Sequence, residues 1–397
     1  MAATPDRFPP RSIPAQAVTG GPRHHFFGYY DKSPWDDSGR WLLGMSSAFM
    51  DRPPGPDDAV VIGLIDCAGG HVWRPLAETR AWNWQQGCML QWLGGGRTGE
   101  IIFNDRRDGR FVSRIVDVNT GRERVIDRPV YAVNRAGTHA VSLNFARLAD
   151  QRPGYGYAGA SDPWREDPAP ADDGLHAIDL ATGRSQLILS VAAAAAWRPH
   201  PEFAGAVHRF NHAQFSPGGR RFAVLHRWKR SPDEEVGRTR LLTLEVDGGG
   251  LDCAADDGFV SHYDWRDDER ILAWASQPGR GNHYYLFGPG GAPPPTMGET
   301  VFDCDGHCSF SPDRRWVLTD TYPDRTQHRT LILLHWETQQ RTDIGRFLSP
   351  TTRWDIRCDL HPRWSPDGQK ICLDSVHEGT RQMYVLDVGG IVSAAHA

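Results

Sequence analysis

Residues 358–387 read CDLHPRWSPDGQKICLDSVHEGTRQMYVLD and predict three short strands separated by tight turns. In the SPDG turn, proline presets φ, aspartate can bond its own backbone and glycine supplies a positive φ. Apolar residues flank this turn at strand spacing, with Trp364 before it and Ile371 and Leu373 after it. The pattern therefore predicts a β-hairpin, and His361 stands shortly before Trp364.

The same unit of strand, turn and apolar strand recurs along the chain. The seven copies span residues 33–44, 90–103, 131–143, 214–225, 263–274, 309–320 and 363–374. They recur about every 55 residues, close to the roughly 40–50 residues of a four-stranded propeller blade. We therefore predict an all-β chain folded as a seven-bladed β-propeller, with two β-sandwich domains as the alternative.

The predicted propeller occupies residues 21–397 as a single domain. Residues 1–20 are Pro-rich and polar, which predicts a loose arm able to contribute a closing strand. The widest gap between copies holds a segment rich in Pro, Gly and Tyr, and an Ala-rich segment at 191–196. We interpret residues 146–207 as an insertion in the third blade, with a short surface helix at the alanines.

Composition argues against several classes of protein. The net charge is −5, which argues against general nucleic-acid binding. No apolar run is long enough to span a membrane, and the opening MAATPDRFPP lacks the apolar core of a signal peptide. The seven cysteines are scattered without a CxxC pair, so we expect reduced thiols in a cytoplasmic protein. Nothing in the sequence indicates an oligomer, and we expect a monomer.

Histidine stands three residues before the aromatic anchor in four consecutive copies, at His212, His262, His307 and His361. The first strand of each propeller blade lines the central channel, so equivalent positions are expected to form a ring at one height. The first three copies carry Lys32, Met89 and Val130 in this frame, which makes the ring one-sided.

Clustered imidazoles are common ligands of transition metals, so the ring predicts a divalent metal site, with Mn or Zn as the expected ion. Direct action of the histidines on a substrate, without metal, is one alternative. Histidine that is merely tolerated at a strand entry is the other.

Other polar side chains are expected at the same mouth of the channel. They comprise His25, Tyr30, Gln86, Asn104, Arg106, Arg152, Tyr155, Tyr157 and Arg209. Aromatic rings can stack on the apolar face of a sugar, amides can bond its hydroxyls and arginine can hold a carboxylate bidentately. The mixture suits a carbohydrate ligand, while a plain surface or turn position is the alternative for each residue alone.

The repeats resemble those of TolB-like propellers. The histidine-bearing copies HAQFSP (212–217), DGHCSFSP (305–312) and DLHPRWSPDG (359–368) resemble, more narrowly, the propeller polysaccharide lyases. That group includes oligogalacturonate lyase, the ulvan lyases and the rhamnose–glucuronate lyases. The resemblance implies β-elimination, in which a base removes the C5 proton of a uronate and the bond to O4 breaks. It also implies a carboxylate neutralised by arginine or a metal, with His or Tyr as base and acid.

The similarity to oligogalacturonate lyase implies a cytoplasmic enzyme with a divalent metal held by histidine and glutamine side chains in the channel. The candidate histidine ligands in this chain are His212, His262, His307 and His361.

The chain departs from the ulvan and rhamnose–glucuronate lyases, which carry a catalytic histidine pair on an early blade. Gln86 and Asn104 or Arg106 stand at the matching places, so the base must come from elsewhere, with Tyr155, Tyr157, His24 and His25 as options. We predict Tyr155, Tyr157, His25 and Arg106 as catalytic residues, and Tyr30, Gln86, Asn104, Arg152 and Arg209 as substrate-binding residues.

The sequence therefore predicts a metal-containing lyase that acts on an acidic, uronate-containing oligosaccharide. A hydrolase that uses paired carboxylates, such as Asp303, Asp305 or Asp359, is one alternative. A non-catalytic propeller that binds a glycan or a protein partner is the other.

Overall fold

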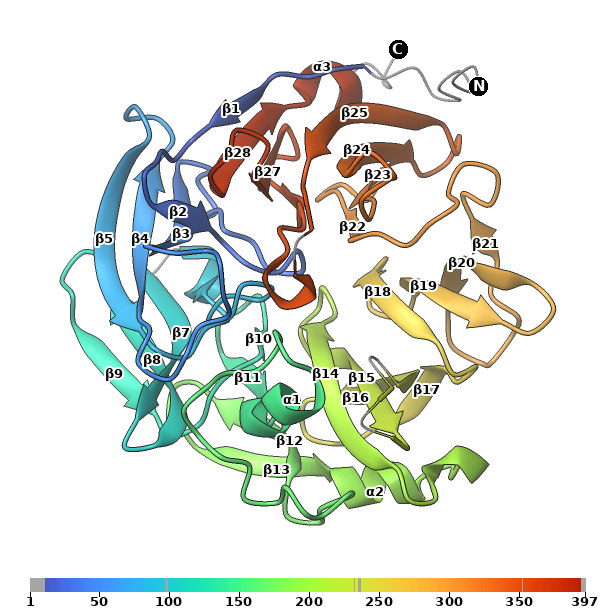
Figure 1. Ribbon diagram of the computed structural model, residues 1–397. Helices are drawn as coiled ribbons and strands as arrows, with labels where there is room; N and C mark the ends of the chain where they lie inside the picture. Colours follow the sequence, from blue (N-terminus) through green and yellow to red (C-terminus); the bar gives the residue numbers. More distant parts are fainter. Residues whose placement is uncertain (1–10, 97–98, 232, 235–236, 352, 394–397) are drawn as a thin grey trace.

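The computed structural model describes residues 11–96, 99–231, 233–234, 237–351 and 353–393. Within these ranges, seven four-stranded antiparallel sheets are arranged around a central axis (Figure 1). The prediction of a seven-bladed β-propeller is confirmed.

Consecutive strands build each blade from the channel outward. Blade 1 comprises β2 (His24–Phe26), β3 (Trp41–Ser47), β4 (Val60–Asp66) and β5 (Val72–Thr79). Blade 2 comprises β6 (Gln91–Trp92), β7 (Glu100–Arg107), β8 (Arg110–Asp117) and β9 (Glu123–Ile126). Blade 3 comprises β10 (Ala132–Val133), β11 (His139–Ser142), β12 (Gly174–Asp179) and β13 (Ser185–Ser190). Blade 4 comprises β14 (Val207–Phe215), β15 (Arg221–Lys229), β16 (Arg238–Glu245) and β17 (Asp252–Ala255).

The remaining blades repeat this order. Blade 5 comprises β18 (Val260–Trp265), β19 (Ile271–Gln277), β20 (Gly281–Phe287) and β21 (Thr296–Met297). Blade 6 comprises β22 (Ser309–Phe310), β23 (Trp316–Asp320), β24 (His328–His335) and β25 (Arg341–Leu348). Blade 7 comprises β26 (Arg363–Trp364), β27 (Lys370–Ser375), β28 (Gln382–Asp387) and, as its outer strand, β1 (Ala15–Ala17).

The SPDG turn joins β26 to β27 as the sequence predicts. Gly368 adopts a φ of +70°, and its amide donates to the carbonyl oxygen of Ser365 at 2.9 Å. Past the turn, Ile371 and Leu373 are completely buried and pack with apolar residues of blade 6 such as Leu318. Each blade thus buries alternate side chains against its neighbour, which is the packing that the period-2 pattern requires.

The first and last parts of the described chain close the ring. Strand β1 pairs antiparallel with β28, with Ala15 opposite Leu386 and Ala17 opposite Tyr384. Val18 follows β1, is 1% exposed and donates its amide to Met383 at 2.9 Å. Residues 1–10 of the predicted arm lie outside the described residues.

Blade 3 carries two outlying segments instead of one continuous insertion. The first lies between β11 and β12 and contains α1 (Phe145–Gln151); the second follows β13 and contains α2 (Val191–Ala196) and η2 (Pro201–Phe203). The predicted alanine helix is α2. Strands β12 and β13 lie between the two segments, so residues 146–207 include part of the blade itself.

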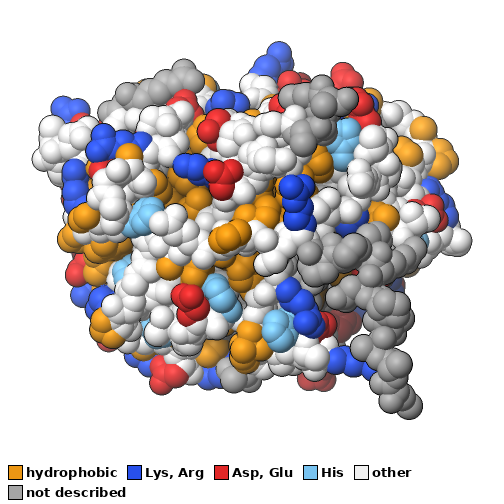
Figure 2. Space-filling model, turned by 90° about the horizontal axis from the view of Figure 1, so that it is seen from above, with side chains coloured by type: hydrophobic (Ala, Val, Ile, Leu, Met, Phe, Trp, Pro, Cys, Tyr) orange, Lys and Arg blue, Asp and Glu red, His pale blue; other side chains and the backbone are white. Residues whose placement is uncertain are grey.

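The short helices outside blade 3 are η1 (Leu93–Gly96), η3 (Trp354–Ile356) and α3 (Gly389–Val392). No helix among the described residues is long and apolar enough to cross a membrane. On the face shown in Figure 2, cationic and anionic side chains lie interspersed, in keeping with the small net charge of −5.

Candidate active site in the propeller channel

The loop after β2 fills the centre of the histidine ring. Gly28 in this loop adopts a φ of +123° and lies against the backbone of Gln86, where a Cβ would come within 2.9 Å. The next residue, Tyr29, places its ring 5.0 Å from His212 and 5.1 Å from His361, between centroids. The rings of His262 and His307 lie 6.5 and 6.1 Å from Tyr29. Histidines from four blades therefore surround Tyr29 in the channel.

A carboxylate lies beside each of these four histidines. The nitrogen–oxygen pairs are His212–Asp31 at 3.6 Å, His262–Asp305 at 3.0 Å, His307–Asp320 at 2.8 Å and His361–Asp359 at 3.8 Å. A carboxylate at one ring nitrogen selects the tautomer and orients the other nitrogen. The hydrogen bonds at His262 and His307 orient these two imidazoles, whereas the carboxylates beside His212 and His361 lie beyond hydrogen-bond distance.

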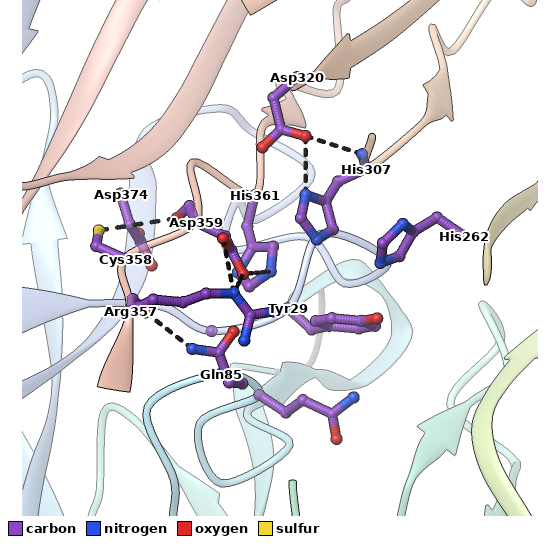
Figure 3. A network of polar contacts seen from close by, with 12 residues as sticks. Tyr29, Gln85, His262, His307, Asp320, Arg357, Cys358, Asp359, His361 and Asp374 are labelled. Atoms are coloured by element: carbon purple, nitrogen blue, oxygen red, sulfur yellow. Dashed lines mark hydrogen bonds and ion pairs between the residues drawn. The ribbon is translucent and has the colours of Figure 1, made fainter. Parts of the chain in front are cut away.

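Three of the described residues could together hold a metal ion. His307, Asp359 and His361 each offer one ligand atom, and these atoms lie within 4.8 Å of one another (Figure 3). His361 is completely buried, and neither of its ring nitrogens has a hydrogen-bond partner. His307 uses Nδ1 for Asp320, which leaves Nε2 for another partner. This nitrogen and oxygen donor set fits a divalent transition-metal ion.

Two arginines keep Asp359 ionised. Nη2 of Arg329 lies 2.5 Å from Oδ1 of Asp359, and Nε of Arg357 lies 2.8 Å from Oδ2. Burial favours the neutral acid, but these two guanidinium groups outweigh burial and hold the pKa of Asp359 well below its usual range. The carboxylate is therefore charged at neutral pH.

The four histidines predicted as metal ligands do not form one compact ligand set. His262 packs on His307, with 4.2 Å between ring centroids, and directs Nδ1 to Asp305. The ring of His212 is tilted against that of Tyr263, with 4.4 Å between centroids, and lies apart from the cluster that contains Asp359. Only two of the four histidines, together with an aspartate, belong to the potential metal cluster, because neighbouring blades place the other two at different points around Tyr29.

A cavity of about 190 Å³ opens beside the ring. The first outlying segment of blade 3 contributes Arg152 and Tyr155 to its wall, and blades 4 and 5 contribute Arg227 and His262. Trp354 of η3 completes the wall, is 41% exposed and stacks on the partly buried Tyr322, with 5.9 Å between ring centroids. This volume is below the roughly 300–1,000 Å³ typical of ligand pockets, so the cavity has room only for a small ligand or one unit of a larger one.

The surroundings of Tyr155 lower the pKa of its hydroxyl group. Nη2 of Arg357 donates to its hydroxyl oxygen at 3.0 Å, and the guanidinium of Arg152 lies 5.0 Å from the ring centroid. Burial alone would raise the pKa of Tyr155, but Arg357 and Arg152 outweigh burial and lower it. The lowered pKa makes this hydroxyl a better proton donor.

His262 is a neutral imidazole on the same cavity. Burial lowers its pKa, and Asp305 offsets only part of the effect. With Asp305 at Nδ1, the neutral ring carries its proton there and leaves Nε2 as an acceptor. The cavity therefore combines a potential base with a potential acid.

Two cations line the cavity. Burial and the charge of Arg152 lower the pKa of Arg227 to about 10, so the Arg227 guanidinium remains charged at neutral pH. Paired guanidinium groups in a confined space recognise a carboxylate. The partly exposed ring of Trp354 adds an aromatic surface beside these cations.

Three of the predicted catalytic residues lie away from this cavity. His25 of blade 1 hydrogen-bonds Gln382 of β28 in blade 7 at 3.1 Å. The guanidinium of Arg106 donates to the carbonyl oxygen of Pro56 at 2.8 Å, near the end of β7. Tyr157 stacks on Phe145 in a packed core, with 4.4 Å between centroids. Their polar groups are used by the fold, and of the predicted catalytic residues only Tyr155 lines the cavity.

Of the predicted substrate-binding residues, some line the cavity or channel and others lie between blades. Arg152 lines the cavity, while Tyr30 lies in the channel and bonds the backbone of Tyr263. The others hold neighbouring blades together: the amide of Gln86 donates to Tyr131 at 2.7 Å and that of Asn104 donates to Val130 at 2.7 Å. Arg209 is buried in β14, opposite Arg227.

Sequence reasoning missed Arg227, Arg357 and Trp354. The sequence could have pointed to Arg357. Residues 357, 359 and 361 alternate along the chain, and alternate residues of an extended segment share a face. Arg227 lies at the far end of a buried strand, where no local pattern distinguishes it from a structural cation.

No protein-family model and no curated protein matches this chain. Among solved structures, it is similar to an oligogalacturonate lyase from Vibrio parahaemolyticus, with 14% identity, a TM-score of 0.67 and coverage of 95% of this chain and 94% of that one. The chain has the fold of the oligogalacturonate lyases. A second such enzyme, solved in complex with manganese, has 16% identity and a TM-score of 0.66, with coverage of 96% and 95%.

The propeller domain of the Trilobed protease from Pyrococcus furiosus is more distant, with 9% identity, a TM-score of 0.52 and coverage of 88% and 90%. At these identities the similarities establish the propeller fold alone.

Proposed function

We propose that this protein is a lyase that cleaves a uronate-containing oligosaccharide by β-elimination. The proposal is based mainly on the side chains that line the cavity. Arg152 and Arg227 line it together with the neutral imidazole of His262 and with Tyr155, whose hydroxyl has a lowered pKa. The similarity in fold to two oligogalacturonate lyases supports it.

The two arginines would bind the uronate carboxylate and stabilise the charge that develops as the C5 proton leaves. His262 would accept that proton at Nε2, and the C5–H electron pair would form the C4–C5 double bond. The bond from C4 to O4 then breaks, and Tyr155 would protonate the departing oxygen.

His307, Asp359 and His361 would hold a divalent cation, Mn or Zn, in this proposal. Such an ion would supply Lewis-acid stabilisation of the acidic group of the substrate. Metal analysis of the purified protein tests the site: bound metal that is lost in His361→Ala supports it. Equal metal content in both proteins contradicts it.

The reaction is tested by incubating the protein with uronate oligosaccharides and following the ultraviolet absorbance of the unsaturated product. We expect the absorbance to rise with the wild type. In His262→Asn the rate of this rise should be lower by about 10²-fold or more, the range for loss of a general base. Saturated reducing sugars would indicate a hydrolase, and binding without cleavage would indicate a non-catalytic propeller.

The same proposal includes a monomeric, cytoplasmic enzyme with an acidic oligosaccharide as substrate. All seven cysteines are free, which is consistent with a reducing compartment.

A further inference from the structure

A cavity of about 390 Å³ lies at the other end of the inner strands, where turns lead from the first to the second strand of the blades. Beside it is a space of about 220 Å³, and the two share Asp31, Lys32, Gln91, Val133, Arg135 and Arg314. We call them together the turn-side mouth. Strand β14 joins both ends of the channel: His212 lines the cavity beside the histidine ring, and Gln214 lines the turn-side mouth.

The loop after β2 separates the two ends. Tyr29 lines the cavity beside the histidine ring, while Asp31 lines the turn-side mouth. Oδ2 of Asp31 accepts from Lys32 at 2.8 Å and lies 3.6 Å from Nε2 of His212. The turn-side mouth is therefore a space of its own, and none of its lining residues lines the cavity of the proposed reaction.

One tryptophan at this mouth has an unused hydrogen-bond donor. The indole N–H groups of Trp92, Trp265 and Trp364 each donate to a backbone carbonyl of the preceding blade, at 2.9, 3.1 and 3.4 Å. Trp35 is the corresponding anchor of blade 1, is 3% exposed and lines the mouth, but its N–H has no partner among the described residues. Because a buried donor without a partner is costly, this N–H indicates an acceptor from outside the chain.

Two buried acceptors at the mouth are also unused. Oδ1 of Asp31 and Oε1 of Gln214 have no hydrogen-bond partner among the residues that the structure describes. The orientation of the Gln214 amide is fixed, because its nitrogen donates to the carboxylate of Asp264 at 2.7 Å and its oxygen can only accept. Hydroxyl groups of a ligand would supply the two missing donors.

Arg314 stands in a turn position where other blades have glycine. In four turns the amide of this residue donates to the carbonyl three positions earlier at a φ of 69° to 73°, and the residues are Gly39, Gly137, Gly219 and Gly368. Arg314 makes the same bond in blade 6 at a φ of +62°, which strains a residue with a side chain. Its guanidinium donates to the carbonyl oxygen of Trp265 at 2.9 Å and lines the mouth, so the strain accompanies a cation placed at a cavity.

Cations outnumber carboxylates at the mouth. Lys32, Arg135 and Arg314 line the larger space against Asp31 and Asp37, which leaves an excess of one positive charge. Arg135 is exposed, and no described residue pairs with its guanidinium. Two guanidinium groups at one cavity recognise a carboxylate or a phosphate.

From these unused groups and this charge we propose that the turn-side mouth binds a small organic anion that carries hydroxyl groups. Arg135 and Arg314 would hold its carboxylate or phosphate group. Its hydroxyls would donate to Asp31 and Gln214, and one of its oxygens would accept from Trp35. The volume of about 390 Å³ lies within the roughly 300–1,000 Å³ typical of ligand pockets. This second site is independent of the proposed reaction, because it uses none of the same residues.

The indole N–H of Trp35 allows a direct test by nitrogen–proton correlation spectra of the full chain. Its resonance is assigned by its loss in Trp35→Phe. Gluconate and glucose 6-phosphate are then titrated separately, so that the tighter ligand identifies the acidic group as carboxylate or phosphate.

We expect at least one of the two anions to move the Trp35 resonance in a saturable way. Sorbitol, which has the hydroxyls without the charge, should leave the resonance in place at the same concentration. A ligand that binds only in the cavity beside the histidine ring would not move it. A resonance that neither anion moves, or that sorbitol moves equally, overturns the proposal.

Two variants test the cations with the same readout. Arg135→Gln changes an exposed side chain, and Arg314→Gly introduces the residue that other turns have, so the fold tolerates both. We expect each to raise the Kd of the anion by about tenfold, the effect of one lost charge-assisted contact. Arg122→Gln, in the exposed turn between β8 and β9, is the matched control and keeps the wild-type Kd. An unchanged Kd in either of the first two variants contradicts the proposal.

Discussion

At the scale of single residues, the cavity owes its chemistry to charges that act on groups of ordinary reactivity. Tyr155 is a common phenol whose pKa is lowered because Arg357 and Arg152 outweigh its burial. Tyr157, two positions along, is also buried, but burial with no arginine beside it raises its pKa well above the usual value. The contrast comes from position in the fold, since the residue type is the same.

These two tyrosines make a matched pair of variants. We expect Tyr155→Phe to lower kcat on a uronate oligosaccharide by about 10²-fold, because the general acid is lost while the arginines still bind the substrate. Tyr157→Phe removes only a hydroxyl that accepts from Asn104, so it leaves kcat near the wild-type value and costs about 1 kcal/mol of stability. Steady-state kinetics and urea unfolding measure both effects, and equal losses of kcat in the two variants would refute the assignment.

At the scale of elements, the outlying segment with α1 positions the reactive phenol. Gly156 lies between Tyr155 and Tyr157, against the first turns of α1. A Cβ there would come within 2.2 Å of the amide nitrogen of Ala149 and 2.3 Å of the carbonyl oxygen of Phe145. The loop can approach the helix this closely only because the side chain is absent.

We therefore expect Gly156→Ala to push the loop from α1, costing about 1–3 kcal/mol of stability and displacing Tyr155. Both the unfolding midpoint and kcat should fall. Gly390→Ala in α3 is the control, because a Cβ there meets no atom within 4 Å. A fully active Gly156→Ala protein would show that the loop does not position the phenol.

The pairing of β1 with β28 is a second effect at this scale. Without residues 1–17, the ring loses the outer strand of blade 7 and its hydrogen bonds. We expect this truncation to lower the free energy of unfolding by at least about 2 kcal/mol, at about 1 kcal/mol for each bond lost. Chemical denaturation of the truncated and full-length proteins gives the difference, and coincident curves would mean that β1 does not contribute to closure.

At the scale of the whole molecule, buried neutral histidines tie stability to pH. Burial lowers the pKa of both His176 and His208 to about 4, whereas an unfolded histidine titrates near about 6.5. Below about pH 6.5 the unfolded chain binds protons that the folded state excludes. This contribution to stability is therefore complete above about pH 6.5 and is lost as the pH falls toward 4.

The urea midpoint should consequently fall between pH 7 and pH 5. In His208→Asn the fall should be smaller, because one group that binds protons only when unfolded has been removed. His283→Gln, at a partly exposed position in β20, should keep the wild-type slope. An unchanged slope in His208→Asn would contradict the linkage.

Local chemistry explains why the blades could be predicted. Alternating apolar residues and turns such as Ser365–Gly368 act over a few neighbours, so each copy specifies its own hairpin, and seven copies specify the propeller. The frame shared by His212 and His361 was visible for the same reason, because a fixed offset from each anchor places a residue at a fixed height in the channel. Both residues have a positive φ, as does Met89 in the same frame, so this strain belongs to the strand entry and not to histidine.

The composition of the cavity was decided only in three dimensions. Arg152, Arg227 and Trp354 come from different blades or loops, and closing the ring brings them together across hundreds of residues of sequence. The pKa values depend on which charges then face each other and on how much water is excluded. The repeat therefore encoded the scaffold and the ring of histidines, whereas long-range packing selected which side chains meet in the cavity.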